Sequence, residues 1–129
     1  MTDQLTTIGP VRVELPPVST MSRVARLTAT GVASMAGFTI DEIDDINVIV
    51  SEVMVALVEH GAQDIIAVTF DVTSGRFTVR GATELANFDL DHPDLALCRT
   101  VLEAVSTDHG IERAGTRAEI WATLQQSLT

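Results

Sequence analysis

The 129-residue sequence contains no lysine, one cysteine and no long apolar run, and each absence excludes a class of protein. Without lysine there is neither the Gly-Lys-Ser/Thr element of a P-loop nor a Schiff-base nucleophile. The single Cys98 cannot form an internal disulfide, and its place after Leu97 suits a small core residue. No apolar run reaches the ~18 residues of a membrane helix. With no basic and apolar signal segment at the N-terminus either, we expect a cytoplasmic protein.

Basic residues are also scarce: eight arginines stand against 18 acids, which gives a net charge of −10. Such a surface repels phosphate backbones, so it disfavours direct nucleic-acid binding and favours a basic protein partner. His60, His92 and His109 lie far apart without metal-ligand spacing, so no metal site is expected. Two acidic clusters near expected helix starts are explained by the helix dipole. They are Asp41, Glu42, Asp44 and Asp45, and then Asp89, Asp91 and Asp94.

Hydrophobic periodicity predicts one domain over residues 10–129, preceded by a polar tail at residues 1–9. Alternating apolar residues predict strands at 11–15, 66–72, 77–79 and 118–124, with a weaker signal at 106–113. Helical spacing predicts helices at about 20–36, 40–60 and 95–105. The strands come in runs and not in strict alternation with helices. This order predicts an α+β two-layer sandwich with helices on one face of a mixed, mostly antiparallel sheet.

Local signals predict where these elements begin and end. Gly37 should end the first helix, Thr39 and Glu42 form a capping box for the second, and Gly61 should end it. The Thr-Ser-Gly at 73–75 predicts a hairpin turn. Each helix also has an expected core stripe. These stripes are Met21, Val24, Leu27, Thr28, Gly31 and Met35, then Ile43, Ile46, Val50, Val53 and Leu57, and finally Leu95, Leu97, Val101, Leu102 and Val105.

Four local patterns, in this element order, resemble those of a known family. Residues 43–46 read Ile-Asp-Asp-Ile and residues 51–60 Ser-Glu-Val-Met-Val-Ala-Leu-Val-Glu-His; residues 83–89 read Thr-Glu-Leu-Ala-Asn-Phe-Asp, 94–97 Asp-Leu-Ala-Leu and 115–116 Gly-Thr. Over about residues 11–125 the chain resembles the anti-sigma-factor serine kinases, small histidine-kinase-like (GHKL) ATPases with the Bergerat fold. The alternative is an unrelated α+β domain. The shared residues are mostly structural: Glu52, Glu59, His60, Phe88, Asp89, Leu95, Leu97 and Gly115.

The chain departs from this family where the family holds its nucleotide. The resemblance places Ala56 at an asparagine that helps to hold magnesium, and Thr83 at an aspartate that accepts from adenine. A methyl group offers no oxygen to a hard cation, and close backbone approach to a ligand needs glycine. The family's motif glycines are replaced by Leu85, Asn87, Asp94 and Ala96. The resemblance thus implies a degenerate ATPase domain without a cofactor, in which Glu52 is a vestigial general base lining a remnant pocket.

Functions of different classes follow from this resemblance. The first is a non-catalytic regulator of the anti-sigma-factor or partner-switching type, which sequesters a sigma factor or an anti-sigma antagonist domain. Arg26 matches an arginine that the family presents to such partners, and Arg23 lies beside it; a solvated arginine face is the ordinary alternative. Trp121, expected on the uncovered sheet face, suits a second interface or a homodimer, unless a loop covers it. The alternatives are a serine kinase with weak residual binding of ATP and magnesium, and a sensor of another small molecule.

Overall fold

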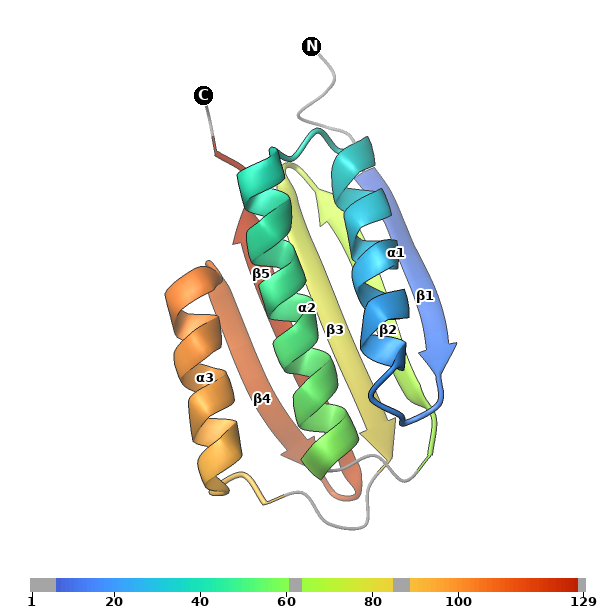
Figure 1. Ribbon diagram of the computed structural model, residues 1–129, viewed down its shortest axis with the longest axis vertical. Coiled ribbons are helices and arrows are strands. Elements are labelled where there is room, and N and C mark those ends of the chain that lie inside the picture. The colour runs from blue at the N-terminus through green and yellow to red at the C-terminus, as the bar shows by residue number, and fades with distance from the viewer. Residues whose placement is uncertain (1–6, 61–63, 85–88, 128–129) are drawn as a thin grey trace.

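The computed structural model describes residues 7–60, 64–84 and 89–127. The three helices of these ranges lie side by side over one face of a sheet, and the other sheet face is left uncovered (Figure 1). The elements are β1 (Thr7–Leu15), α1 (Met21–Met35), α2 (Ile40–His60), β2 (Ile66–Thr73), β3 (Arg76–Glu84), α3 (Pro93–Val105), β4 (Asp108–Ala114) and β5 (Arg117–Gln125). This arrangement confirms the predicted α+β two-layer class.

The sheet has the strand order β1-β2-β3-β5-β4, and each of its four described pairings is antiparallel. The sequence had suggested a mixed, mostly antiparallel sheet, but the described sheet is antiparallel throughout. The weak strand signal at 106–113 corresponds to β4, which pairs with β5 across a hairpin. β1 begins earlier than predicted, because Thr7 and Ile8 pair with Thr73 and Val72. Residues 7–9 thus belong to the sheet and not to a tail.

The core lies where α2 packs on the middle of the sheet. Val53 and Leu57 of α2 are fully buried, as the periodicity predicted. A Cβ atom on Gly81 of β3 would lie 2.8 Å from the Leu57 Cδ1 atom and 2.9 Å from the Val53 Cγ1 atom. The absence of a side chain at Gly81 therefore allows α2 to rest directly on β3. In the described ranges, no helix has the combination of length and apolar character that a membrane crossing requires.

The predicted helix and hairpin ends are mostly confirmed. The Thr39 N–H donates to the Glu42 carboxylate at 2.7 Å, and the Glu42 N–H donates to Thr39 Oγ1 at 3.1 Å, as a capping box requires. Gly37 follows α1 with φ +81°, and the hairpin turns through Ser74 and Gly75 with φ 52° and 77°. Gly61, the expected end of α2, lies outside the described residues.

The predicted core stripe of α1 is mostly wrong, although Met21 packs against the core. Val24, Leu27 and Met35 are 39%, 65% and 75% exposed. The face that α1 buries consists mainly of small residues, because small side chains let the helix lie close to its neighbours. They are Ser22, Ala25, Ala29, Val32 and Ala33.

A similar error affects α3. Leu97 is 62% exposed, and Cys98 is buried in its place between Leu95 and Leu102. The expectation that Cys98 is a core residue is confirmed. Leu97 instead borders the cavity described next.

Candidate functional site

A cavity of about 170 Å³ lies between α2 and α3. Helical spacing of three and four residues places its α2 side chains on one face of that helix. α3 supplies the opposite wall. The lining residues are Glu52, Val55, Ala56, Glu59, His60, Asp94, Leu97 and Cys98.

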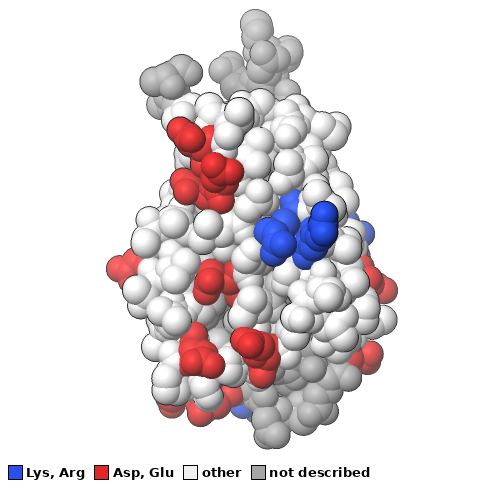
Figure 2. Space-filling view, in the orientation of Figure 1, with Lys and Arg blue, Asp and Glu red and all other residues white. Residues whose placement is uncertain are grey.

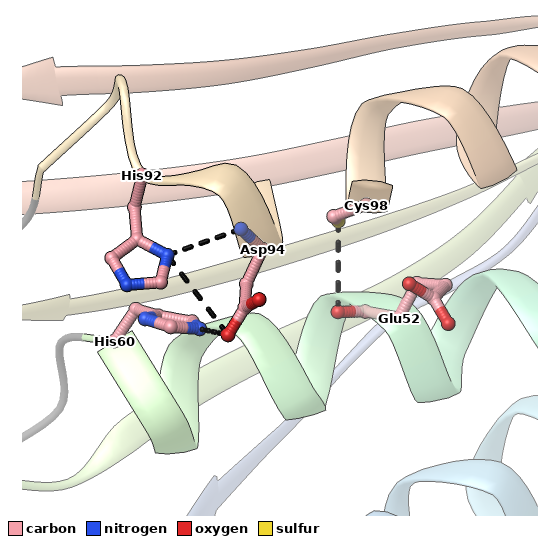
Figure 3. Close-up of polar contacts among 5 residues, drawn as sticks. All are labelled: Glu52, His60, His92, Asp94 and Cys98. Atoms are coloured by element: carbon pink, nitrogen blue, oxygen red, sulfur yellow. Dashed lines mark hydrogen bonds and ion pairs between the residues drawn. The ribbon is translucent and has the colours of Figure 1, made fainter. Parts of the chain in front are cut away.

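Cys98 on α3 lies opposite the backbone of Glu52 on α2 (Figure 3). The Cys98 thiol donates to the backbone carbonyl of Glu52 at 3.8 Å. Burial, and secondarily the nearby Glu52 carboxylate, raise the pKa of Cys98 to about 12, against an opposing effect of Arg99. Burial also raises the pKa of Glu52 above its usual value. Cys98 is thus a protonated packing residue, whereas Glu52 is a partly desolvated carboxyl group.

Two histidines and an aspartate meet where α2 ends and α3 begins (Figure 3). His60 Nε2 lies 3.1 Å from Asp94 Oδ2, and His92 Nδ1 lies 3.9 Å from the same oxygen. His92 is the N-cap of α3, and its Nδ1 accepts the Asp94 backbone N–H at 3.1 Å. The two imidazole ring centroids are 4.4 Å apart. The fold has therefore assembled a compact group of nitrogen and oxygen donors.

The structure brings together three of the seven residues predicted for the remnant pocket, namely Glu52, Ala56 and Asp94. The other described ones lie elsewhere. Thr83 is buried in β3 and donates to the Ile65 carbonyl at 3.0 Å, which gives it a structural role. Ala96 is exposed on α3 and is not among the described lining residues. The predicted positions at 85 and 87 lie outside the described residues.

Sequence reasoning did not assign the histidines to this site. His60 follows Glu52 by eight residues and Ala56 by four, so its helical face was readable in advance. His92 is 32 positions from His60, and no spacing rule connects them. Their separation in sequence was the reason for expecting no metal ligands, and the packing of α3 on α2 removes that reason.

The described lining is acidic. It contains the carboxyl groups of Glu52, Glu59 and Asp94, and no arginine. Phosphate groups would meet like charge there, and the Ala56 methyl provides no metal ligand. The volume is also below the ~300–1,000 Å³ usual for small-molecule sites. The cavity therefore has the chemistry of a cation or water site more than that of a nucleotide site.

The predicted partner-binding arginines lie on α1 and differ in environment. Figure 2 shows basic side chains gathered over α1 on the helix-covered face, separate from the acidic side chains over α2 and α3. Arg23 is exposed, whereas Arg26 is half-buried. Arg26 Nη1 donates to Ser51 Oγ of α2 at 3.2 Å. Arg26 therefore bridges α1 and α2 and is only partly available to a partner.

Exposed apolar side chains lie on both of the bridged helices. Val24 and Leu27 lie on α1, and Val48 and Val55 lie on α2, at 39%, 65%, 41% and 44% exposure. Val48 and Val55 stand three residues before and four after Ser51, so they share its helical face. The docking face is defined here as Arg23, Val24, Leu27, Val48 and Val55. Its mixture of arginine and exposed aliphatic groups is typical of a protein interface.

Trp121 lies on the uncovered sheet face, as alternation in β5 predicted, but it is only partly exposed. A Cβ atom on Gly110 of β4 would lie 2.5 Å from Trp121 Nε1, so the indole packs directly over this glycine. The guanidinium carbon of Arg80 lies 5.7 Å from the ring centroid, and Arg80 also pairs with Glu119 at 2.6 Å. Gly110 and Arg80 on the same sheet face therefore cover part of the Trp121 indole.

Known proteins with similar sequences are serine-protein kinases. Serine-protein kinase RsbW of Bacillus velezensis is 32% identical over 90 residues, which are 67% of this chain and 56% of that protein. RsbW of Bacillus subtilis is 33% identical over 85 residues, 63% of this chain and 53% of that protein. The chain thus spans about half the length of the curated relatives it matches. No protein-family model matches it.

A solved structure has the same fold. The crystal structure of the RsbU and RsbW domains of a Mycobacterium tuberculosis protein superposes with a TM-score of 0.77 at 20% identity, covering 95% of this chain and 34% of that one. The fold is therefore GHKL-like. Together with the sequence relatives, it identifies the chain as a member of the anti-sigma-factor kinase group, as the motifs had indicated.

Proposed function

We propose that this chain is a non-catalytic regulator of the partner-switching type, which acts by sequestering a protein partner. The observation that carries the proposal is the buried Ala56 at the wall of an acidic cavity, where a nucleotide-binding relative needs a magnesium ligand. Asp94 and Glu59 add negative charge to the same wall. A protein that does not bind Mg-ATP has no phosphoryl group to transfer.

The partner is proposed to bind the docking face. Arg23 supplies a planar group that pairs bidentately with a carboxylate, and the four aliphatic residues supply apolar area around it. A sigma factor or an anti-sigma antagonist domain is the partner class that the sequence relatives suggest. The overall charge of −10 favours a partner whose remaining surface is basic.

Titration with Mg-ATP tests the non-catalytic part of the proposal. A ligand at 100 times its dissociation constant stabilises the folded state by roughly 2.7 kcal/mol, so binding is visible as a rise in melting temperature. We expect no change with Mg-ATP or Mg-ADP. A micromolar dissociation constant measured by calorimetry would contradict the proposal.

A second candidate is a serine kinase with weak residual ATP binding, and Glu52 favours it. This carboxyl group lies in the cavity with a pKa raised by burial, as suits a general base. Incubation with labelled ATP and an antagonist domain separates the two candidates. Phosphate transfer that is lost in Glu52→Gln, at unchanged melting temperature, would establish the kinase; we expect no transfer in either protein.

A further inference from the structure

We infer that His60, His92 and Asp94 form a binding site for a zinc-like divalent transition metal, between the end of α2 and the start of α3. This site lies beyond the proposed sequestering function and does not depend on it. It also departs from the sequence-based expectation of no metal, which rested on the separation of the histidines along the chain.

The separations of the donor atoms fit such an ion. One donor atom from each residue lies within 4.8 Å of the other two. His60 Nε2 and Asp94 Oδ2 are 3.1 Å apart, and His92 Nδ1 and the same oxygen 3.9 Å. In a tetrahedral zinc site with bonds of ~2.0–2.1 Å, neighbouring donor atoms are about 3.3 Å apart. The observed separations lie on either side of that value, so small side-chain movements suffice.

His60 has a buried nitrogen without a hydrogen bond. Its side chain is 15% exposed, and Nε2 has no hydrogen-bond partner among the described residues, although Asp94 Oδ2 lies at ion-pair distance. Buried polar atoms are normally paired, and each exception needs an explanation. A metal ion between Nε2 and the carboxylate satisfies both atoms at once.

His92 Nδ1 lies beside the same carboxylate, 3.9 Å from Asp94 Oδ2, with its lone pair engaged in capping α3. Its Nδ1 accepts the Asp94 backbone N–H, so this nitrogen is unprotonated, as a metal ligand must be. An ion bound at Nδ1 takes the place of that N–H. The lost capping bond lowers the net affinity, so we expect micromolar rather than tighter binding.

The donor set also selects the ion. Two imidazoles and one carboxylate suit zinc and its neighbours, whereas magnesium prefers oxygen ligands alone. Three protein ligands leave the fourth tetrahedral position to water. Glu52 and Glu59 line the same cavity and favour the entry of a cation. The site lies one helical turn beyond Ala56, so it differs from the magnesium position of the nucleotide-binding relatives.

Calorimetry with zinc chloride on the untagged protein tests the site. We expect one zinc ion per chain, with a micromolar dissociation constant and a rise in melting temperature, and no effect of magnesium chloride. Three variants localise the binding: His60→Gln, His92→Asn and the control His109→Asn, which changes a histidine on β4. Asparagine at 92 keeps a good N-cap, so the fold is maintained while the imidazole is lost.

Each possible result of the zinc titrations either supports the proposed site or overturns it. The dissociation constant should rise at least ~10-fold in His60→Gln and in His92→Asn, an effect already typical of losing an outer-shell partner, and stay unchanged in His109→Asn. Equal binding in all four proteins would show zinc adsorbed to other acidic or histidine side chains and would overturn the inference. Absence of zinc binding to the folded wild-type protein would do the same.

Discussion

The cavity and the docking face share α2, but they differ in what their side chains can do. The cavity lies on the α3 side of this helix, where Ala56 and three carboxyl groups form an acidic lining. The docking face lies toward α1, where Val48 is exposed on the helix that carries the Arg26–Ser51 bridge. Val55 is exposed between the two regions, because it also lines the cavity. The comparison teaches that one helix can present an acidic, partly enclosed flank to one neighbour and an exposed apolar flank to the other.

The largest effect is expected where α2 meets the sheet, since both regions depend on this contact. Leu57→Ala removes a fully buried side chain and should destabilise the protein by ~2–5 kcal/mol. Val55→Ala, two residues earlier and 44% exposed, should change stability by less than ~0.5 kcal/mol. Urea denaturation of both variants measures the difference. Equal destabilisation would mean that Val55 is also a core residue and not part of a docking face.

The next effect concerns the docking face itself. Arg23→Ala should weaken the complex with the partner by ~2 kcal/mol, about thirtyfold in affinity, with stability changed by less than ~0.5 kcal/mol. Arg26→Ala should also weaken the complex, but it removes a partly buried hydrogen bond and should cost ~1 kcal/mol of stability as well. Calorimetric titration and denaturation of the same samples separate the two quantities.

Ser51→Ala serves as the matched control for Arg26, because it removes the hydrogen bond and keeps the guanidinium group. If Arg26 contacts the partner, Ser51→Ala should lower stability while affinity stays near that of the wild type. Unchanged affinity in well-folded Arg23→Ala and Arg26→Ala proteins would place the interface elsewhere, with the Trp121 face next to be tested.

A smaller effect is expected at the start of α2, where the capping box fixes the helix that both regions use. Thr39→Ala should cost ~1 kcal/mol of stability at pH 7.

Burial would raise the pKa of Glu42, but hydrogen bonds from Thr39 and Ser127 outweigh this effect and hold the pKa of Glu42 below its ordinary value of 4.5. The ionised Glu42 therefore stabilises the folded state above pH 4.5, and this contribution is lost as the pH falls further. The stability difference between wild type and Glu42→Gln should shrink between pH 6 and pH 3; a constant difference would refute the assignment.

The smallest effect is expected on the uncovered sheet face. Arg80→Ala removes the cation–π contact with Trp121 and the exposed pair with Glu119, and should cost at most ~1 kcal/mol. Partner affinity should not change, because the proposed interface is on the opposite side of the sheet. Trp121 fluorescence reports the local change directly, and a loss of affinity would move the interface to this face.

Much of the fold was predictable because its signals are local. The Thr39–Glu42 box, Gly37 and the Ser74-Gly75 turn act within a few residues, so they identify element ends without tertiary information. The stripe of α2 was also readable, since the helix packs on the sheet with large side chains such as Leu57. Of the candidate site, the helical spacing of Glu52 and Ala56 was correct for the same reason.

Sequence by itself therefore determined the two-layer class, the central helix and the absence of a metal-ligating oxygen at Ala56, because each depends on composition, spacing or a single residue. Tertiary structure alone decided which face of α1 is buried: both of its faces carry apolar residues, and only close packing selects Ala25 and Ala29 over Leu27. It also decided that Arg26 donates a hydrogen bond to Ser51 and that the ring centroids of His60 and His92 lie 4.4 Å apart. Contacts between distant segments depend on how the helices pack on the sheet, and no periodicity within one segment contains that information.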